Sequence, residues 1–279
     1  MVALIDFDSI LYKSIYFCLD RKNDNGEFIR TTISFCRELL SNHTKEQAKS
    51  LFMQEVYNEG INRCENEILK MQNYLQSIFL EEIKSWELYI TSCTKPFRAE
   101  VSREYKKKRK RNNYVWMLRE HYKFNDAFFS DTHEADDLIF DRAKELGNGN
   151  FIVVSIDKDL KQIGGYYWSY QKEPEKDLQG NYCLNEHGNK MYNYKYNSVD
   201  YITNKEANIF FWMQMLMGDS VDGVAGLKRV GIKTAEKILK NSLCPWVTVA
   251  REYIKRNQKE DFYTNYKLLK LGNGKLECY

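Results

Sequence analysis

The sequence predicts an α/β fold in which a central, mostly parallel sheet is flanked by helices. Short apolar segments of strand length alternate along the chain with longer segments of helical periodicity. Two of the apolar segments, 2–5 and 151–156, have the character of buried strands, and an aspartate follows each, Asp6 and Asp157. Functional side chains gather at the carboxyl ends of the strands in such sheets, so both aspartates are candidate site residues.

In the first half of the chain, a short helix is expected over about 9–18, after the first strand. A long helical region is expected over 31–84, because apolar residues recur there at spacings near three and four. A second strand is expected over 86–92. The basic stretch 97–113 follows, and then a helix over 114–123.

In the second half, a helix is expected over 134–147, where Gly147 would stop it. After the strand at 151–156, the segments 166–170 and 182–184 are expected to form a hairpin or neighbouring strands. A helix is expected over 205–217. The segment 218–238 reads as a loop followed by a helix, because glycines punctuate it.

The composition bounds the class of protein. With 279 residues and 43% hydrophobic content, the chain can bury a substantial core. No stretch approaches the roughly 20 apolar residues of a membrane span, and no basic leader precedes an apolar run, so we expect a cytoplasmic protein with no membrane partner. The seven cysteines form no Cys-x-x-Cys pair and the four histidines are scattered, which argues against a disulfide framework and a zinc site.

Acidic residues form four short clusters. They are Asp6 and Asp8, then Glu134, Asp136 and Asp137, then Asp157 and Asp159, and finally Asp219 and Asp222. Carboxylates held together without cations would repel one another, and some would take up protons at neutral pH. Divalent cations remove that penalty, and oxygen ligands favour Mg²⁺ or Mn²⁺. Two such ions about 3.5–4 Å apart could activate a water and stabilise the leaving oxygen of a phosphodiester.

Each cluster has a simpler explanation when it is taken alone. An Asp-x-Asp after a strand usually forms a turn or caps a helix, and an Asp-Asp pair at a helix start usually interacts with the helix dipole. Asp8 in particular could cap the helix that follows it. The four clusters together, two of them at strand ends, favour a shared metal site.

Basic residues are concentrated between the second strand and the second acidic cluster, with aromatic residues among them. They are Arg98, Arg103, Lys106, Lys107, Lys108, Arg109, Lys110 and Arg111, interleaved with Phe97, Tyr105 and Tyr114. Basic side chains neutralise phosphates, and aromatic rings offer stacking surfaces for unpaired bases. The alternative is a solvated polybasic loop without a partner.

In combination and in this order, the motifs resemble the flap endonuclease and 5′-nuclease family, which includes phage 5′-exonucleases and the nuclease domain of bacterial DNA polymerase I. The matching segments are Ile-Asp, Phe-Arg followed by Tyr-Lys-x-x-Arg, Glu-Ala-Asp-Asp, Asp-Lys-Asp-Leu, and Gly-Asp-x-x-Asp-Gly followed by Gly-Ile-Lys-Thr-Ala. The resemblance runs from Asp6 to about Leu239. It implies a PIN-like 5′-nuclease fold: a nuclease core over 1–204 with a helical arch at about 95–130, and a helix-hairpin-helix region over 205–279.

The resemblance also implies the roles of individual residues. For the first metal ion, the implied ligands are Asp6, Glu134, Asp136, Asp137 and Asp157, and for the second they are Asp159, Asp219 and Asp222. Lys106 and Arg109 would act on the scissile phosphate. The implied DNA contacts are Arg98, Tyr105 (stacked on a terminal base), Lys107, Lys108, Lys110 and Arg111 in the arch, and Lys228, Arg229, Gly231, Lys233 and Thr234 in the helix-hairpin-helix element.

The implied activity is 5′→3′ exonuclease and flap endonuclease cleavage of DNA with a 5′ flap or 5′ end, and also of RNA–DNA hybrids at primers, as in replication. It would use two Mg²⁺ ions, for which Mn²⁺ could substitute. A K⁺ ion at the helix-hairpin-helix element and a monomeric state are further expectations.

Two departures from the family keep other hypotheses open. The family has a further aspartate at the end of the second strand, where this chain reads Ile90-Thr91-Ser92-Cys93, so Asp8 is a possible substitute. Arg229 stands where the family has a glycine, and Gly226 and Gly231 are expected to permit the tight backbone of that element. The alternatives are a DNA-structure-binding protein with weak or no catalysis, and a PIN-type RNase.

Overall fold

The structure is a computed structural model that describes residues 1–15, 21–22, 28–93, 95–109, 112–174, 176–177, 179–184, 192–194 and 198–272. Its main sheet has six strands in the order β10-β7-β6-β1-β4-β5. They are β1 (Val2–Asp6), β4 (Ser85–Tyr89), β5 (Ala127–Phe128), β6 (Phe151–Val154), β7 (Gly165–Trp168) and β10 (Asp200–Ile202). Only β10 runs antiparallel to its neighbour within this described sheet. The predicted α/β class with a mostly parallel sheet is confirmed.

Strand β1 lies inside the sheet, with β4 on one side and β6 on the other. Its residues Ala3, Leu4 and Ile5 are fully buried, which explains why the segment is continuously apolar. Asp6 is in register with Tyr89 of β4, and Ile5 is in register with Val154 of β6. Because the three strands are parallel and end together, the residues that follow them meet at one edge of the sheet.

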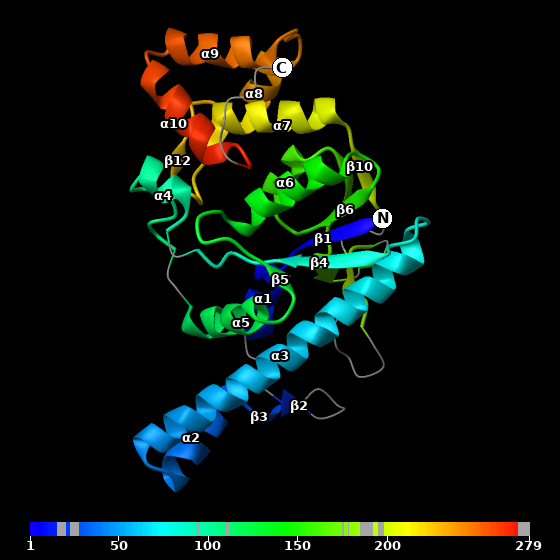
Figure 1. Cartoon of the computed structure of the whole chain (residues 1–279), viewed down its shortest axis with the longest axis vertical. Helices are drawn as coiled ribbons and strands as arrows, with labels where there is room; N and C mark the ends of the chain where they lie inside the picture. Colours follow the sequence, from blue (N-terminus) through cyan, green and yellow to red (C-terminus); the bar gives the residue numbers. More distant parts are fainter. Residues whose placement is uncertain are drawn as a thin grey trace.

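Helices cover both faces of the sheet (Figure 1). On one face lie α1 (Asp8–Ile15), α3 (Lys45–Ile78) and α5 (Asn113–Lys123), which share an apolar cluster with Ala3 and Ile5. On the other face lies α6 (Ala135–Leu146), followed in the chain by the 3-10 helix η1 (Lys158–Gln162), and their apolar cluster includes Leu4. This division follows from the alternation of side chains along β1.

The helical region predicted over 31–84 is two helices, α2 (Thr32–Asn42) and α3. Each begins with a capping box, in which Thr31 pairs with Ser34 and Thr44 pairs with Gln47. Helix α3 has 34 residues, and it runs past the sheet so that its first turns and α2 project away from the core (Figure 1). A Cβ atom at Gly60 would lie 3.1 Å from side chains of α1 and α5, so the small residue permits close packing there.

The C-terminal helices form a separate apolar cluster beside the sheet. They are α7 (Asn204–Met217), α8 (Ile232–Leu239), α9 (Pro245–Lys255) and α10 (Lys259–Leu269), with the short strands β11 (Gly218–Asp219) and β12 (Val224–Ala225) between α7 and α8. Tyr105, from the segment after α4 (Phe97–Val101), belongs to the same cluster. This contact brings the basic segment toward the loop that carries Asp219 and Asp222.

Several predicted boundaries change. Strand 86–92 ends at Tyr89 and strand 151–156 ends at Val154, which frees the following residues to turn into the edge of the sheet. The helix predicted over 9–18 is described as far as Ile15, and its remaining residues lie outside the described part. The predicted helices over 114–123 and 205–217 are confirmed as α5 and α7.

The prediction that 166–170 and 182–184 are paired strands is wrong. β7 pairs with β6 and with β10, because it continues the main sheet, and Tyr182 instead forms an isolated bridge with Lys176. Two further short hairpins are described, β2 (Arg21–Lys22) with β3 (Phe28–Arg30) and β8 (Lys172–Pro174) with β9 (Tyr192–Tyr194). Within the described ranges, none of the helices combines the length and the apolar character needed to cross a membrane.

Candidate active site at the carboxyl edge of the sheet

A cleft of about 790 Å³ lies at the edge where β1, β4 and β6 end. Acidic side chains from four separate segments line it, together with cationic side chains from the loop after α4. The acidic residues on its lining are Asp6, Asp8, Glu134, Asp136, Asp157, Asp159 and Asp222. Seven of the acidic residues singled out in the sequence, drawn from all four clusters, therefore converge on one cavity.

Asp6, Asp136 and Asp157 are the carboxylates at the strand ends and at the start of α6. Asp6 is the last residue of β1, is 5% exposed, and accepts a hydrogen bond of 2.7 Å from the Ser155 hydroxyl. Asp157 caps η1, because its side chain accepts a hydrogen bond of 2.9 Å from the Asp159 amide. The alternative explanation of this aspartate as a helix cap is therefore also correct. In the described part of the chain, no Lys or Arg lies within 4.0 Å of these three carboxylates.

The lack of a neutralising cation shows in the acid–base properties of two of these groups. Burial raises the pKa of Asp6 to about 7, and the negative charges of Asp8 and Asp157 add to the effect. Burial and the charges of Asp6 and Asp157 raise the pKa of Asp136 well above its usual range. The neighbouring negative charges make ionisation of Asp6 and Asp136 more costly, and added positive charge would remove that cost.

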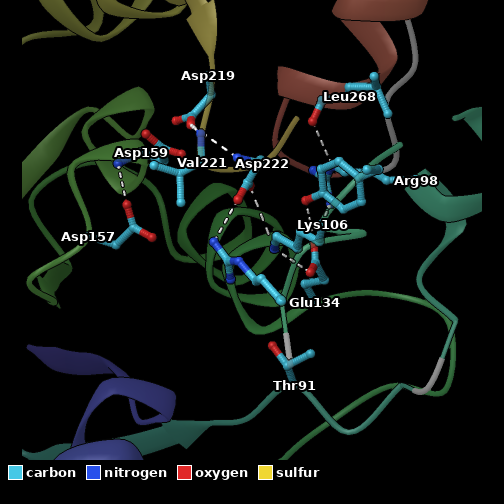
Figure 2. A network of polar contacts seen from close by, with 12 residues as sticks. Thr91, Arg98, Lys106, Glu134, Asp157, Asp159, Asp219, Val221, Asp222 and Leu268 are labelled. Carbon is cyan, nitrogen blue, oxygen red and sulfur yellow. Dashed lines mark hydrogen bonds and ion pairs between the residues drawn. The ribbon is translucent and has the colours of Figure 1, made fainter. Parts of the chain in front are cut away.

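The remaining carboxylates of the cleft are paired with cationic side chains (Figure 2). Lys106 contacts Glu134 and lies 3.8 Å from Asp222, and Arg109 pairs with Asp222 at 2.6 Å. Burial alone would raise the pKa of Glu134, but Lys106 and Arg98 outweigh it and the pKa lies below the usual range. Lys106 and Arg109 thus lie among the carboxylates of the cleft.

Lys158 joins the two acidic residues assigned to the second ion. Its amino group lies 3.1 Å from both Asp159 and Asp219. Asp219 is 9% exposed and also accepts hydrogen bonds from the amides of Val221 and Asp222. The Asp-Lys-Asp-Leu segment predicts its two aspartates as site residues, but nothing in the motif indicates that the lysine between them pairs with Asp219.

Arg98 and Asp137 form a buried pair that corrects two predictions. Arg98 is 2% exposed, and its five N–H donors are all engaged: two with Asp137 at 2.6 Å each, one with Glu134, and two with the carbonyl oxygens of Leu268 and Lys270. Asp137 is fully buried and also accepts from the Gly272 amide. Arg98 has no donor left for a phosphate and Asp137 has no oxygen facing the cleft, so both hold α4, α6 and the segment after α10 together.

Tyr105 is the third correction. Its ring is 7% exposed, its hydroxyl donates to Glu134 at 2.7 Å, and the Lys106 amino group lies over its face at 5.0 Å. A terminal base could not stack on a ring that is covered in this way. Tyr105 instead orients Glu134, and burial among apolar side chains raises its pKa far above the ordinary value.

The predicted DNA contacts that remain lie on the surface. Lys107 and Lys108 are exposed, and Lys107 pairs with Glu104 at 2.8 Å. Lys110 and Arg111 lie outside the described residues. Lys228, Arg229, Gly231, Lys233 and Thr234 are all exposed before or within the first turn of α8.

The backbone of this element requires glycine at one of the two expected positions and not at the other. A Cβ atom at Gly226 would lie 2.1 Å from the backbone of Met217, so that position requires glycine, as expected. Gly231 has extended backbone angles, and a Cβ atom added to it would have no described atom within 4 Å. The expectation of tight backbone geometry at Gly231 is therefore wrong. Arg229, by contrast, has φ +60°, the left-handed conformation that a glycine would adopt without strain.

Asp8 and Thr91 occupy the position after β4 at which the family has a further aspartate. The Thr91 amide donates to Oδ2 of Asp8 at 3.2 Å, so Asp8 does lie beside the position where a carboxylate was expected. However, Oδ1 of Asp8 accepts from Arg119, a residue that the sequence analysis did not single out. The Thr91 hydroxyl accepts from the Ala135 amide at 3.0 Å and so helps to position the first turn of α6.

The donor set fits a hard divalent cation. Among the described residues, no group of three or more His, Cys, Asp or Glu side chains is arranged as a ready metal cage. The charge requirement is nevertheless present, because three carboxylates meet without a partner cation and two of them have raised pKa values. Carboxylate oxygens are the ligands that Mg²⁺ and Mn²⁺ prefer. Asp6, Asp136 and Asp157 are therefore the residues that would hold such an ion.

Comparison with known proteins identifies neighbours by structure only. No family model and no curated protein matches the sequence. The fold is similar to the flap endonuclease of bacteriophage T5 in a pseudo-enzyme–product complex with DNA and metal ions (12% identity, TM-score 0.47). It is also similar to the T5 5′-exonuclease with bound zinc (13% identity, TM-score 0.46). Each alignment covers 96% of this chain and 93% of the other.

Proposed function

We propose that the chain is a Mg²⁺-dependent, structure-specific 5′-nuclease that hydrolyses phosphodiester bonds in DNA with a 5′ flap or a 5′ end. One observation supports the proposal most strongly. Asp6, Asp136 and Asp157 line a cleft that also contains Lys106 and Arg109, and within the described residues none of the three pairs with a Lys or Arg side chain. Such a cleft combines sites for metal ions with cations that can bind the substrate phosphate.

Asp6, Asp136 and Asp157 would hold the first ion, and Asp159, Asp219 and Asp222 would serve a second, partly through waters. Bound divalent ions, Mg²⁺ or Mn²⁺, would supply charge stabilisation at the phosphoryl group and a water of lowered pKa. Hydrolysis forms one bond from the water oxygen to phosphorus and breaks the bond to the leaving nucleotide oxygen. In this scheme Glu134 and Asp222 keep Lys106 and Arg109 at the cleft until a phosphate takes over their donors.

Lys106 suits the role of stabilising charge on the phosphate. Burial would lower its pKa, but Glu134 and Asp222 outweigh that effect and raise it, so the ammonium group stays charged at neutral pH. Its backbone is also fixed, because its amide donates to the carbonyl of Asp222 at 3.0 Å. A preorganised donor aimed at developing charge is worth about 10²–10³ in rate at comparable sites.

The exposed residues at the start of α8 would bind the backbone of the duplex and so place the end of the strand in the cleft. Lys228, Arg229 and Lys233 supply charge, and the free amides of the first turn of α8 supply donors, because no side chain caps this helix. A K⁺ ion at this element, cleavage of RNA–DNA hybrids at primers, a role in replication and a monomeric state belong to the same proposal.

A 5′-labelled flap substrate tests the proposal directly. Wild-type protein should cleave near the junction in Mg²⁺ and in Mn²⁺, and not in EDTA. Asp157→Ala should bind the flap and leave it intact, whereas Asp200→Asn, which alters an exposed aspartate on the edge strand β10, should cleave like wild type. Full activity of Asp157→Ala would sink the proposal.

The second candidate is a DNA-structure-binding protein without catalysis. Two observations favour it. Thr91 stands where a carboxylate was expected, and six of the nine acidic residues are engaged by Lys, Arg or Tyr side chains. Tight flap binding by wild-type protein with no cleavage in either metal would select this candidate.

A further inference from the structure

Five cationic side chains from the described residues line the cleft, and one of them, Arg119, has no part in the proposed reaction. Arg119, on α5, lines the same cavity as the strand-end carboxylates, and its side chain is 13% exposed. Its ion-pair partner is Asp8 of α1, whereas Lys106 and Arg109 pair with Glu134 and Asp222. The cleft therefore has a second cationic position, on the side formed by α1, α5 and the end of β4.

Arg119 is held firmly in this position. Its Nε and Nη2 atoms both lie near a single oxygen of Asp8, at 2.9 and 2.8 Å. The other oxygen of Asp8 accepts from the Thr91 amide, so Asp8 is itself fixed at the end of β4. The rings of Tyr12 and Trp116 lie 5.7 and 6.0 Å from the guanidinium carbon. Leu118, the preceding residue, is fully buried and anchors α5 to the core.

The pairing leaves part of the guanidinium group without an acceptor. Arginine has five N–H donors in a planar fork, and Asp8 uses only those of Nε and Nη2. Within the described residues, no acceptor pairs with Nη1 of Arg119. A fixed guanidinium with free donors at a cleft suits an anion with several oxygens, and phosphate is the anion that a nucleic acid presents.

We propose that Arg119 is a substrate-binding residue that contacts a backbone phosphate next to the bond to be cut. The choice of a nucleic acid as the ligand rests on the proposed function. Arg119 would then be a second phosphate-binding position, in addition to the one formed by Lys106 and Arg109. Position 91 is a threonine and not an aspartate, so Asp8 is the acidic partner of Arg119 at the end of β4. A single oxygen of Asp8 does not use all five N–H donors of the guanidinium group. Arg119 binds and positions the strand; it takes no part in bond breaking.

Binding of a flap DNA in EDTA, where no cleavage occurs, tests the inference independently of catalysis. Arg119→Gln should raise Kd about 10-fold, in keeping with the loss of a charged hydrogen bond. The slope of log Kd against log salt should fall by about 1, as expected when one phosphate contact is removed. Arg142→Gln is the matched control, because Arg142 also sits on a helix and pairs with carboxylates but lies outside the cleft. It should leave both quantities unchanged.

Asp8→Asn separates a phosphate contact from a merely structural ion pair. It breaks the same pair but frees Arg119, so DNA should bind as tightly as to wild type, or more tightly. If the pair were only structural, Asp8→Asn and Arg119→Gln would weaken binding alike and leave the salt slope unchanged, which would overturn the inference. Arg119→Lys keeps the charge and serves if Arg119→Gln does not fold; its Kd should rise severalfold because the planar fork is lost.

The two proposals can fail separately. Cleavage in Mg²⁺ together with an unchanged salt slope for Arg119→Gln would refute the phosphate contact alone. A reduced salt slope in a protein that never cleaves would refute the nuclease function alone. In an active enzyme, Arg119→Gln should raise KM about as much as Kd, with kcat within about threefold of wild type.

Discussion

Asp136 and Asp137 are neighbours in the sequence, yet they belong to two different parts of the molecule. Asp136 faces the cleft and pairs with no Lys or Arg of the described part of the chain, whereas Asp137 is fully buried and bonded to two guanidinium nitrogens of Arg98. Successive residues of a helix point about 100° apart, so one turn of α6 can supply both a free carboxylate and a structural one. The comparison teaches that partners decide the function of a carboxylate, and residue type alone does not.

The same contrast extends across the site. The side near α4 and α10 is closed by Arg98, Tyr105 and Lys106, which satisfy Asp137 and Glu134. At the strand ends, Asp6, Asp136 and Asp157 form no ion pair with any described Lys or Arg, and the pKa values of Asp6 and Asp136 are raised. The closed side should therefore govern stability, and the open side should govern metal binding and activity. Substitutions on each side distinguish these two roles.

Substitution on the open side should abolish activity and leave the fold intact. Asp136→Asn should reduce cleavage of a 5′-flap DNA by at least about 10³-fold, because it removes a charged oxygen ligand of the first ion. Its thermal midpoint in EDTA should equal or exceed that of wild type, since one repelling charge is gone. A variant that unfolds would show that Asp136 belongs to the structural side after all.

Substitution on the closed side should act on stability. Arg98→Ala leaves Asp137 buried without its partner and should cost about 3–5 kcal/mol in the free energy of unfolding, measured by urea titration. The double variant Arg98→Met, Asp137→Leu should recover much of that loss, because it removes both buried charges together. A loss under about 1 kcal/mol for Arg98→Ala would contradict the structural role.

The pH dependence of stability in EDTA should report on Asp6. Its pKa in the folded protein is about 7, above its value of 3.8 in the unfolded chain, so the folded state holds the proton more tightly. The stabilisation that results is complete below about pH 4 and is lost as the pH rises toward 7, by an amount on the order of a few kcal/mol. Asp6→Asn should flatten this decline, and saturating Mg²⁺ should offset it at pH 8. An identical pH profile for Asp6→Asn would show that Asp6 is already neutralised.

The smallest effect is expected outside the cleft, at α8. Lys233→Gln should raise Kd for flap DNA a few-fold and lower the salt slope by up to about 1, with kcat unchanged at saturating substrate. Lys267→Gln, on α10, is a suitable control because it alters a lysine outside both the cleft and the element at 228–234. Equal effects of the two variants would indicate a general charge effect and not a duplex-binding element.

Much of the architecture could be predicted from the sequence by itself. The buried apolar runs at 2–5 and 151–156 determine that β1 and β6 lie inside a parallel sheet, since only strands covered on both faces can be continuously apolar. Glu134 and Gly147 mark the ends of α6, because a capping box and a positive φ are local requirements. The spacing of the acids, together with the two strand ends, was enough to place most of them at one edge.

Only the tertiary structure decided how those acids are partnered. Arg98 lies 39 residues from Asp137 and some 170 from the Leu268 carbonyl, so nothing local in the sequence marks it as buried. Tyr105 and Arg119 likewise receive their roles from contacts with Glu134 and Asp8, on distant segments. Pairing between charges depends on distance and burial after folding, and the order of residues along the chain specifies neither. The sequence therefore determined which carboxylates gather at the sheet edge, and the packing of α4, α5 and α10 decided which of them remain free.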